Sequence, residues 1–286
     1  MPLVSSTGML TQARREGYCI GAFNVHTLEM LQAVVEAAEE AKAPLILQST
    51  VGTIKHLGIS YMAAMAKVAA ESASVPIALH LDHSHDYELI EQCIKAGYTS
   101  VMIDASMHPF AENVERTRRV VELAERYGVN VEAELGKVGG VEDDLSVADA
   151  DATLADPAEC EEFVRLTGVH TLAPAIGTAH GMYKGVPKLD FARIEAISKG
   201  TSVPLVLHGG SGIPDEQVRR AASLGMAKMN VATELRIGFS DAIKQVFREK
   251  PDENDPRTYM KPAKQAVKEI ALAKMEMCGC IGKAQK

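Results

Sequence analysis

Eight short, almost uniformly apolar segments recur along the chain, and each is followed by a longer amphipathic segment. Many of the apolar segments end in glycine or a polar residue, which is typical of strands buried in a parallel sheet. They cover residues 22–25, 44–49, 77–83, 100–106, 130–136, 171–177, 204–210 and 228–233. The amphipathic segments repeat apolar residues every three to four positions, as helices with one buried face do. They cover approximately residues 28–41, 60–73, 87–96, 111–127, 157–166, 190–199, 214–224 and 234–249.

Eight strands that alternate with eight helices predict an α/β fold of the closed (β/α)8 type, the TIM barrel. The length of 286 residues fits one such barrel, and 47% hydrophobic residues are enough for its large core. We therefore expect a single domain over residues 1–286. An open, doubly wound sheet is the alternative, but it usually has fewer strands and a GxGxxG turn, which this sequence lacks.

The charge and the termini exclude several functional classes. A net charge of −8 argues against nucleic-acid binding, which requires a basic surface. No apolar stretch reaches the roughly 18 residues of a membrane helix, and the N-terminus lacks the pattern of a signal peptide. The five cysteines are scattered, which predicts free thiols and a cytoplasmic location.

Two segments interrupt the alternation of strands and helices. Residues 136–156 contain paired glycines and a run of acidic residues without an apolar period, which predicts a long unstructured loop. Such a loop in a compact domain is often a functional lid, although a solvated surface loop is the simpler interpretation. The second segment is a C-terminal extension over residues 250–286, with a polar stretch containing prolines followed by a helical run to Met277.

Three histidines occupy matching places at the ends of different predicted strands. They are His83, His180 and His208. The active site of a TIM barrel lies at these strand ends, so the three side chains can converge there. Three histidine ligands with one open position are typical of catalytic zinc. Because side chains alternate along a strand, His83 would face away from Asp82 and His80, so we expect the strand to break at His83.

Asp82 and two polar turns complete the predicted site. A carboxylate beside a metal ligand can move a proton on a substrate hydroxyl, and the alternative is that Asp82 only orients a histidine ligand. The turns GGSG (209–212) and NVAT (230–233) follow the last two predicted strands and precede helices. Phosphate is usually bound at this place in a TIM barrel, by backbone N–H groups and a helix N-terminus.

Five further segments stand in a specific order: LHLDHS (79–84), VEAELGKVGGVEDD (131–144), AIGTAHGMY (175–183), LHGGSGIPDE (207–216) and KMNVATEL (228–235). Together they resemble the class II ketose-bisphosphate aldolases. The similarity extends over nearly the whole chain, from AFNVH (22–26) to DPRTYM (255–260). It implies that the chain is a zinc-dependent aldolase and that the zinc ligands are His83, His180 and His208.

The resemblance also implies roles for other residues. Asp82 would exchange a proton with the C4 hydroxyl of the substrate, and Glu142, in the predicted loop, would exchange one at C3. Asp104 and Glu134 would hold zinc in an alternative, buried position. A dihydroxyacetone phosphate site, with Na⁺ or K⁺ nearby, is implied at Gly181, Gly209, Gly210, Ser211, Asn230, Val231, Ala232 and Thr233.

Further substrate contacts and an assembly are implied in the same way. Asn24 and Thr50 would touch the substrate, and Arg257 would reach the distal phosphate, in a neighbouring subunit. The family leads us to expect a homodimer or homotetramer, and a non-catalytic partner subunit is a further expected component.

The identity of the sugar depends on few residues. Fructose-bisphosphate members of the family often carry Asp or Asn at the position of Ala232, whereas NVATEL is more similar to the tagatose-1,6-bisphosphate branch. We therefore expect cleavage of tagatose 1,6-bisphosphate into dihydroxyacetone phosphate and glyceraldehyde 3-phosphate. Fructose 1,6-bisphosphate or another phosphorylated ketose is the alternative.

Three other interpretations fit the sequence less well. A Schiff-base mechanism through Lys228 would leave the three histidines unexplained. A zinc hydrolase would not require the two turns at the phosphate site. A non-catalytic subunit of an aldolase complex would be expected to lack some of the histidines or Asp82, and all four are present.

Overall fold

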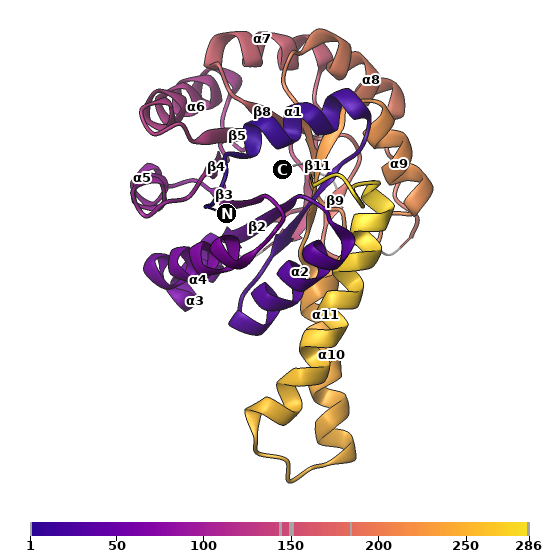
Figure 1. Cartoon of the computed structure of the whole chain (residues 1–286). Coiled ribbons are helices and arrows are strands. Elements are labelled where there is room, and N and C mark those ends of the chain that lie inside the picture. The colour runs from indigo at the N-terminus through magenta and orange to yellow at the C-terminus, as the bar shows by residue number, and fades with distance from the viewer. Residues whose placement is uncertain (1, 143–144, 149–151, 184, 285–286) are drawn as a thin grey trace.

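The computed structural model describes residues 2–142, 145–148, 152–183 and 185–284, and for residues 141, 142 and 145–147 the backbone alone. Eight parallel strands close into a barrel in the order β1-β11-β10-β8-β5-β4-β3-β2 (Figure 1). They are β1 (Ile20–Asn24), β2 (Leu45–Thr50), β3 (Ile77–Ser84), β4 (Ser100–Ile103), β5 (Asn130–Leu135), β8 (Thr171–Pro174), β10 (Leu205–Leu207) and β11 (Met226–Val231). The predicted TIM barrel is confirmed, and the open sheet was the wrong alternative.

The barrel is surrounded by helices, and several of them begin at capping residues. The eight expected helices are α2 (Leu28–Ala41), α4 (Ile59–Ser72), α5 (Tyr87–Lys95), α6 (Phe110–Glu125), α7 (Pro157–Thr167), α8 (Phe191–Gly200), α9 (Asp215–Ser223) and α10 (Thr233–Glu249). Asp86, Asp156 and Asp190 each accept a hydrogen bond from a backbone N–H in the first turn of the following helix. Pro157 occupies the first turn of α7, where its missing N–H has no cost.

Two helices were not predicted. Helix α1 (Ser6–Glu16) buries only Ser6, Leu10 and Ala13, so its apolar period is too sparse to recognise in the sequence. Helix α3 (Val51–Leu57) is seven residues long and follows β2 directly, where Thr50 accepts a hydrogen bond from Thr53 N. Both helices are therefore stabilised by tertiary packing, and the spacing of their apolar residues does not reveal them in the sequence.

The described residues of the segment 136–156 are more ordered than predicted. Strands β6 (Gly139–Glu142) and β7 (Leu145–Val147) pair antiparallel, and β6 also pairs in parallel with β9 (Ala179–His180). A bridge between Lys137 and Thr153 closes the base of the segment. The expectation of an unstructured loop was therefore wrong, because strands of two to four residues have no recognisable period.

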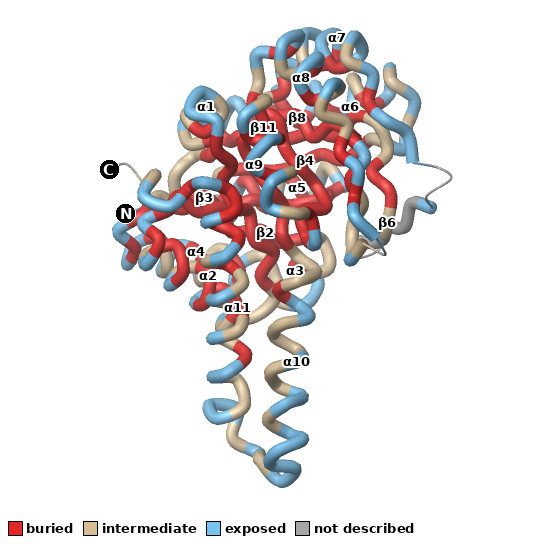
Figure 2. Tube along the Cα trace, turned by 90° about the vertical axis from the view of Figure 1, so that its right-hand side faces the viewer, coloured by how far each residue is buried: buried red, intermediate tan, exposed pale blue. Residues whose placement is uncertain are grey.

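The C-terminal part forms a helical hairpin that projects from the barrel. Helix α10 leads outward and α11 (Pro256–Cys278) returns to pack against α2, and the far end of the hairpin is largely exposed (Figure 2). The returning helix starts at Pro256 and contains Pro262, so the polar stretch that was expected before the helix is partly helical. Asp255 caps this helix, which explains its early start. Among the described residues, none of the helices has the length and apolar character of a membrane span.

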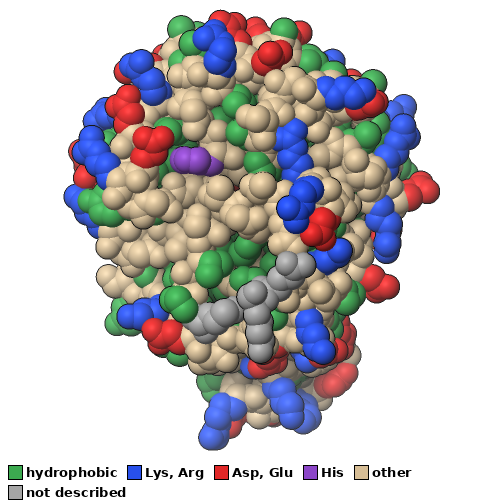
Figure 3. All heavy atoms as spheres, turned by 45° about the horizontal axis from the view of Figure 1, so that its top comes forward, with side chains coloured by type: hydrophobic (Ala, Val, Ile, Leu, Met, Phe, Trp, Pro, Cys, Tyr) green, Lys and Arg blue, Asp and Glu red, His purple; other side chains and the backbone are tan. Residues whose placement is uncertain are grey.

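Charges of both signs alternate on the surface, while the interior of the barrel is polar. Lys and Arg side chains are interspersed with Asp and Glu on the face shown in Figure 3. Inside the barrel, buried polar residues occupy alternate positions of the strands, for example His80 and Asp82 on β3 and Lys228 and Asn230 on β11. The intervening residues, such as Leu81, are apolar and belong to the hydrophobic core. The polar interior is therefore available for chemistry rather than packing.

Candidate active site

Three histidines from separate segments meet at one end of the barrel. His83 lies at the end of β3, His180 in β9, and His208 directly after β10. Their ring centroids are 4.9 Å apart for His83 and His180, 4.6 Å for His83 and His208, and 5.8 Å for His180 and His208. One ring nitrogen from each lies within 4.8 Å of the other two, which is close enough for a shared metal ion. The convergence expected from the sequence is thus present.

His83 reaches this point because the extended backbone of β3 is interrupted at this residue. The residue has a φ of 46°, and the register between β3 and β4 shifts between Leu81 and Ser84. A positive φ is uncommon for a residue other than glycine and costs free energy. The predicted break is confirmed, and it allows His83 and Asp82 to serve the same side of the barrel.

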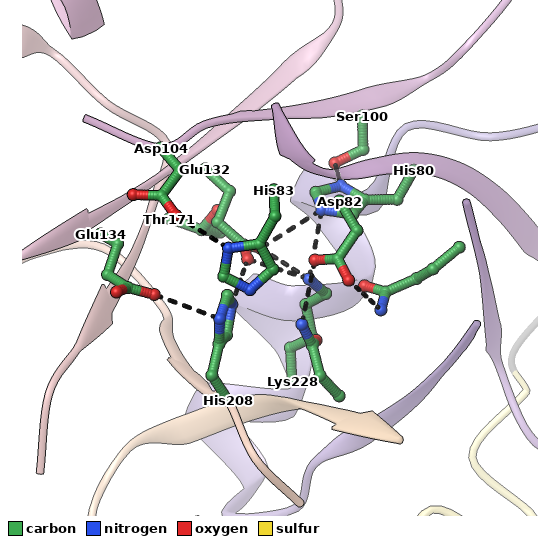
Figure 4. A network of polar contacts seen from close by, with 12 residues as sticks. His80, Asp82, His83, Ser100, Asp104, Glu132, Glu134, Thr171, His208 and Lys228 are labelled. Atoms are coloured by element: carbon green, nitrogen blue, oxygen red, sulfur yellow. Dashed lines mark hydrogen bonds and ion pairs between the residues drawn. The ribbon is translucent and has the colours of Figure 1, made fainter. Parts of the chain in front are cut away.

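Buried carboxylates orient two of the three imidazoles (Figure 4). Nδ1 of His83 lies 2.9 Å from Asp104 Oδ2, and Nε2 of His208 lies 2.9 Å from Glu132 Oε1. A neutral imidazole that donates one N–H to a carboxylate presents the lone pair of its other nitrogen, as zinc-binding histidines do. The donor set therefore fits a zinc ion. A second set, His83, Asp104 and Glu134, also converges within 4.8 Å and shares His83 with the first.

The pKa shifts of these groups follow from their contacts. Burial alone would raise the pKa of Asp104, but the hydrogen bond and charge of His83 lower it well below its ordinary value. Burial would lower the pKa of His208, but hydrogen bonds with Glu132 and Glu134 raise it to about 9. The Asp104 carboxylate consequently stays ionised, and a metal ion bound at Nδ1 of His208 would replace the second proton that Glu132 and Glu134 stabilise on this ring.

Asp82 lies in the centre of the barrel beside this cluster. It is fully buried and accepts hydrogen bonds from Asn24 Nδ2 at 2.9 Å and Asn230 Nδ2 at 3.1 Å, with Gln48 Nε2 at 3.5 Å. Burial would raise its pKa, but the charges of His83 and other neighbouring bases lower it. An ionised carboxylate held by three amides can accept a proton. Gln48 was not predicted, although a glutamine within the apolar run LILQST was a visible signal.

Lys228 is fully occupied by ionic and hydrogen-bond contacts. Its Nζ lies 2.8 Å and 3.0 Å from the two oxygens of Glu132 and 3.3 Å from Nε2 of His80. A Schiff base requires a neutral, accessible amine, whereas this ammonium is 1% exposed and paired with a carboxylate. The geometry therefore does not support the Schiff-base alternative. His80 and Glu132 were not assigned a role from the sequence.

The expected phosphate-binding turns surround a small cavity next to His180. Its lining residues are His180, Gly181, Gly209, Gly210, Ser211, Asn230, Ala232 and Thr233. Helix α10 begins at Thr233, so the N-terminal end of its dipole faces this cavity. Tyr183 connects the two sides, because its hydroxyl accepts from Ala179 N and donates to Gly209 O, each at 2.9 Å. The turns therefore lie where an anion beside the histidines can be held.

The remaining predicted residues are placed less centrally. Thr50 is buried at the end of β2 and its hydroxyl caps α3, while Val231 is buried in the core. Arg257 lies in the first turn of α11, with its side chain 90% exposed and paired with Asp255. The backbone of Glu142 lies in β6, but its side chain is outside the described part of the chain, as are Asp143 and Asp144.

A closed barrel with a histidine cluster and an anion cavity at the ends of its strands defines a candidate metalloenzyme. Comparisons identify the family. The model of the class-II fructose-bisphosphate aldolase family matches residues 4–283. The chain belongs to this family and is a class II aldolase, a carbon–carbon lyase.

Individual relatives agree with this assignment. The chain is 51% identical to the D-tagatose-1,6-bisphosphate aldolase subunit GatY of Klebsiella oxytoca over 282 residues, 99% of each chain. It is 50% identical to a probable fructose-bisphosphate aldolase of Bacillus subtilis over 287 residues, 99% of this chain and 100% of the relative. The crystal structure of the YdjI aldolase from Escherichia coli K12 superposes with a TM-score of 0.87 at 36% identity, covering 99% of this chain and 100% of that one.

Proposed function

We propose that this aldolase cleaves tagatose 1,6-bisphosphate reversibly into dihydroxyacetone phosphate and glyceraldehyde 3-phosphate, and that it depends on one zinc ion per subunit. The observation that carries the proposal is the meeting of an ionised Asp82, three histidines and an anion cavity at one end of the barrel. An aldol cleavage needs a base, an electron sink and a holder for the phosphate, and these groups supply all three.

Each group has a defined task in the reaction. Asp82 takes the proton of the C4 hydroxyl, the C3–C4 bond breaks, and its electron pair passes into the carbonyl of the dihydroxyacetone phosphate half. Zinc, when held by His83, His180 and His208, supplies a Lewis acid for that carbonyl. Glu142 then delivers a proton to C3. Asn24 and Asn230 keep Asp82 oriented by the hydrogen bonds described above.

The phosphate that stays with the dihydroxyacetone half would bind in the cavity beside His180. Backbone N–H groups of Gly209 and Ser211 and the start of α10 favour an anion there, while Gly210 lines the cavity with its N–H donated to Asn230 O at 3.0 Å. We extend the proposal to a Na⁺ or K⁺ ion near this phosphate, to Thr50 as a substrate contact, and to Asp104 and Glu134 as the alternative zinc position.

Assembly belongs to the same proposal. The exposed Arg257 would bind the distal phosphate in the site of a neighbouring copy, which requires a homodimer or homotetramer. The name of the Klebsiella relative describes it as a subunit, so a non-catalytic partner is a further component to test.

Fructose 1,6-bisphosphate is the second candidate substrate, because the Bacillus relative at 50% identity is a probable fructose-bisphosphate aldolase. The two sugars are epimers at C4, the carbon that carries the hydroxyl next to Asp82. The preference for tagatose rests on the resemblance at Ala232, where fructose-bisphosphate members of the family often carry Asp or Asn.

The test is aldol cleavage of both sugars, with and without a chelator, measured as kcat/KM. We expect chelator-sensitive cleavage with at least a tenfold preference for tagatose, about 1.4 kcal/mol of discrimination. Equal or reversed rates would retain the aldolase and reject the tagatose preference. Activity that persists in a metal-free His208→Ala variant would reject the zinc mechanism.

Glu142 can be tested separately from cleavage. The Glu142→Ala variant should retain zinc but lose exchange of the C3 proton of dihydroxyacetone phosphate with solvent, measured by loss of deuterium label. A normal exchange rate would remove Glu142 from the mechanism.

A further inference from the structure

A second group of metal-binding side chains lies deeper in the barrel than the three histidines. His80, Asp82 and Glu132 each offer a donor atom within 4.8 Å of the other two. None of the three is more than 1% exposed. Two carboxylates and an imidazole in a dry site form a donor set that suits a divalent cation.

A lysine occupies this place. The Nζ atom of Lys228 contacts both oxygens of Glu132 and Nε2 of His80 (Figure 4). An ammonium group is only a donor, so His80 Nε2 must be the acceptor and the ring hydrogen must be on Nδ1. That hydrogen is donated to Ser100 Oγ at 2.7 Å. The nitrogen that a metal would use is therefore directed at the lysine.

The same contacts hold this group rigidly against the floor of the barrel. Ser100 donates to Asn130 Oδ1 at 3.3 Å, and Asn130 Nδ2 donates to Thr7 Oγ1 in α1 at 3.1 Å. The donors thus point in one direction from Lys228 down to α1. Such a fully satisfied chain keeps His80 in a single orientation.

Glu132 links this group to the catalytic cluster. While one of its oxygens accepts from both Lys228 and His208 Nε2, the other accepts from Lys228 alone. A cation at this position therefore sets the orientation of the carboxylate that orients His208. Without any cation, two buried carboxylates would face each other, which is strongly destabilising.

We propose that Lys228 is a built-in cation that fills a latent second metal site formed by His80, Asp82 and Glu132. It thereby limits the subunit to one zinc ion and positions His208 through Glu132. The inference rests on the proposed zinc site of the three histidines. Lys228 is then a positioning residue, and its ammonium group occupies a place where these three side chains would otherwise bind a divalent metal ion.

The experiment measures zinc stoichiometry and affinity of the full-length chain by equilibrium dialysis with elemental analysis. The Lys228→Met variant is expected to bind two zinc ions per chain, whereas the wild type binds one. The affinity for the first ion should fall about tenfold to a hundredfold, because Glu132 loses the partner that fixes it. Adding His80→Asn to Lys228→Met should return the stoichiometry to one.

A matched control is available in Lys274. It is also buried, at 6% exposed, and its Nζ lies 2.6 Å from Glu234. The Lys274→Met variant removes a buried lysine from a carboxylate outside the second donor set, so it should still bind one zinc ion. Two ions in this control would show that loss of any buried lysine creates adventitious binding, which would overturn the proposal.

Other outcomes decide the remaining cases. A Lys228→Met variant that binds one zinc ion with wild-type affinity would overturn the inference. If this variant does not fold, zinc binding to the wild type at high free zinc is the deciding measurement. A second ion that the wild type binds and the His80→Asn variant does not would mean that Lys228 does not fill the site, and would overturn the inference. Failure of the three-histidine site is seen separately, as unchanged zinc binding in His208→Ala.

Discussion

Two glycines in the turn 209–212 allow a prediction with an internal control. Gly209 and Gly212 both have left-handed backbones, with φ of 68° and 81°. An alanine at either position costs roughly 1–2 kcal/mol from this conformation alone. The two sites differ in what a Cβ would meet. At Gly209 it would lie 2.3 Å from the carbonyl oxygen of Ala179, whereas at Gly212 it would lie 3.3 Å from the side chain of Tyr183.

The size of the effect follows from this difference. Real Cβ atoms essentially never approach another heavy atom within 3.0 Å, so the Ala179 carbonyl must move by at least about 0.7 Å in Gly209→Ala. Ala179 precedes His180, and the displacement passes directly to that ring. A misplacement of about 1 Å can reduce catalysis roughly a hundredfold, equivalent to about 2.7 kcal/mol. The Tyr183 side chain can rotate away, so Gly212→Ala lacks this second cost.

The assay is cleavage of the preferred bisphosphate, with dihydroxyacetone phosphate measured by a coupled dehydrogenase, alongside zinc affinity. We expect kcat/KM of Gly209→Ala to fall about a hundredfold and its zinc affinity to fall with it. Gly212→Ala should lose less than tenfold and keep its zinc affinity. Equal losses in the two variants would show that backbone conformation, and not the contact with Ala179, limits this turn, and would refute the reasoning.

Three further predictions concern single groups. Asp82→Asn should retain zinc and lose kcat by about 10² to 10⁴ in steady-state cleavage assays, because the proposed base is gone; a loss below tenfold would contradict that role. Tyr183→Phe removes the hydroxyl that joins Ala179 to Gly209, so urea unfolding should show a loss of about 1–2 kcal/mol, and an unchanged midpoint would argue against the bridge. Burial lowers the pKa of the half-buried His170 from 6.5, so the unfolded state binds a proton that the folded state does not. Stability should therefore fall as the pH drops below about 6.5. Between pH 7 and 5, the urea midpoint of His170→Gln should depend less on pH than that of the wild type. An identical pH dependence in the two proteins would exclude His170 as the cause.

The barrel was predictable because its strands are continuous apolar runs separated by periodic helices. The parts that were not predicted have no such period. Helix α1 buries three residues, and β9 is two residues long. These elements are stabilised by contacts with distant segments, such as β9 with β6, and pattern alone carries no information about those contacts.

The candidate site shows the same division. His83, His180 and His208 could be chosen because they stand at matching strand ends, and the break at His83 follows from strand alternation. The hydrogen bonds of Gln48 with Asp82 and of Glu132 with Lys228 could not be derived from the sequence. They depend on the order of the strands around the barrel and on their register. The closed order of the strands brings Glu132 on β5 to Lys228 on β11, 96 residues further along the chain.

The parallel pairing of β6 with β9 has a thermodynamic consequence. Gly140 stands opposite His180, and the backbones are so close that a Cβ on Gly140 would lie 2.2 Å from the carbonyl oxygen of His180. Glu142 follows two residues later on the same strand. Order in β6 and occupancy of the histidine cluster are therefore linked equilibria, and each must favour the other by the same coupling free energy. On the proposed mechanism, loss of zinc would therefore also reduce the preorganisation of the strand that carries Glu142.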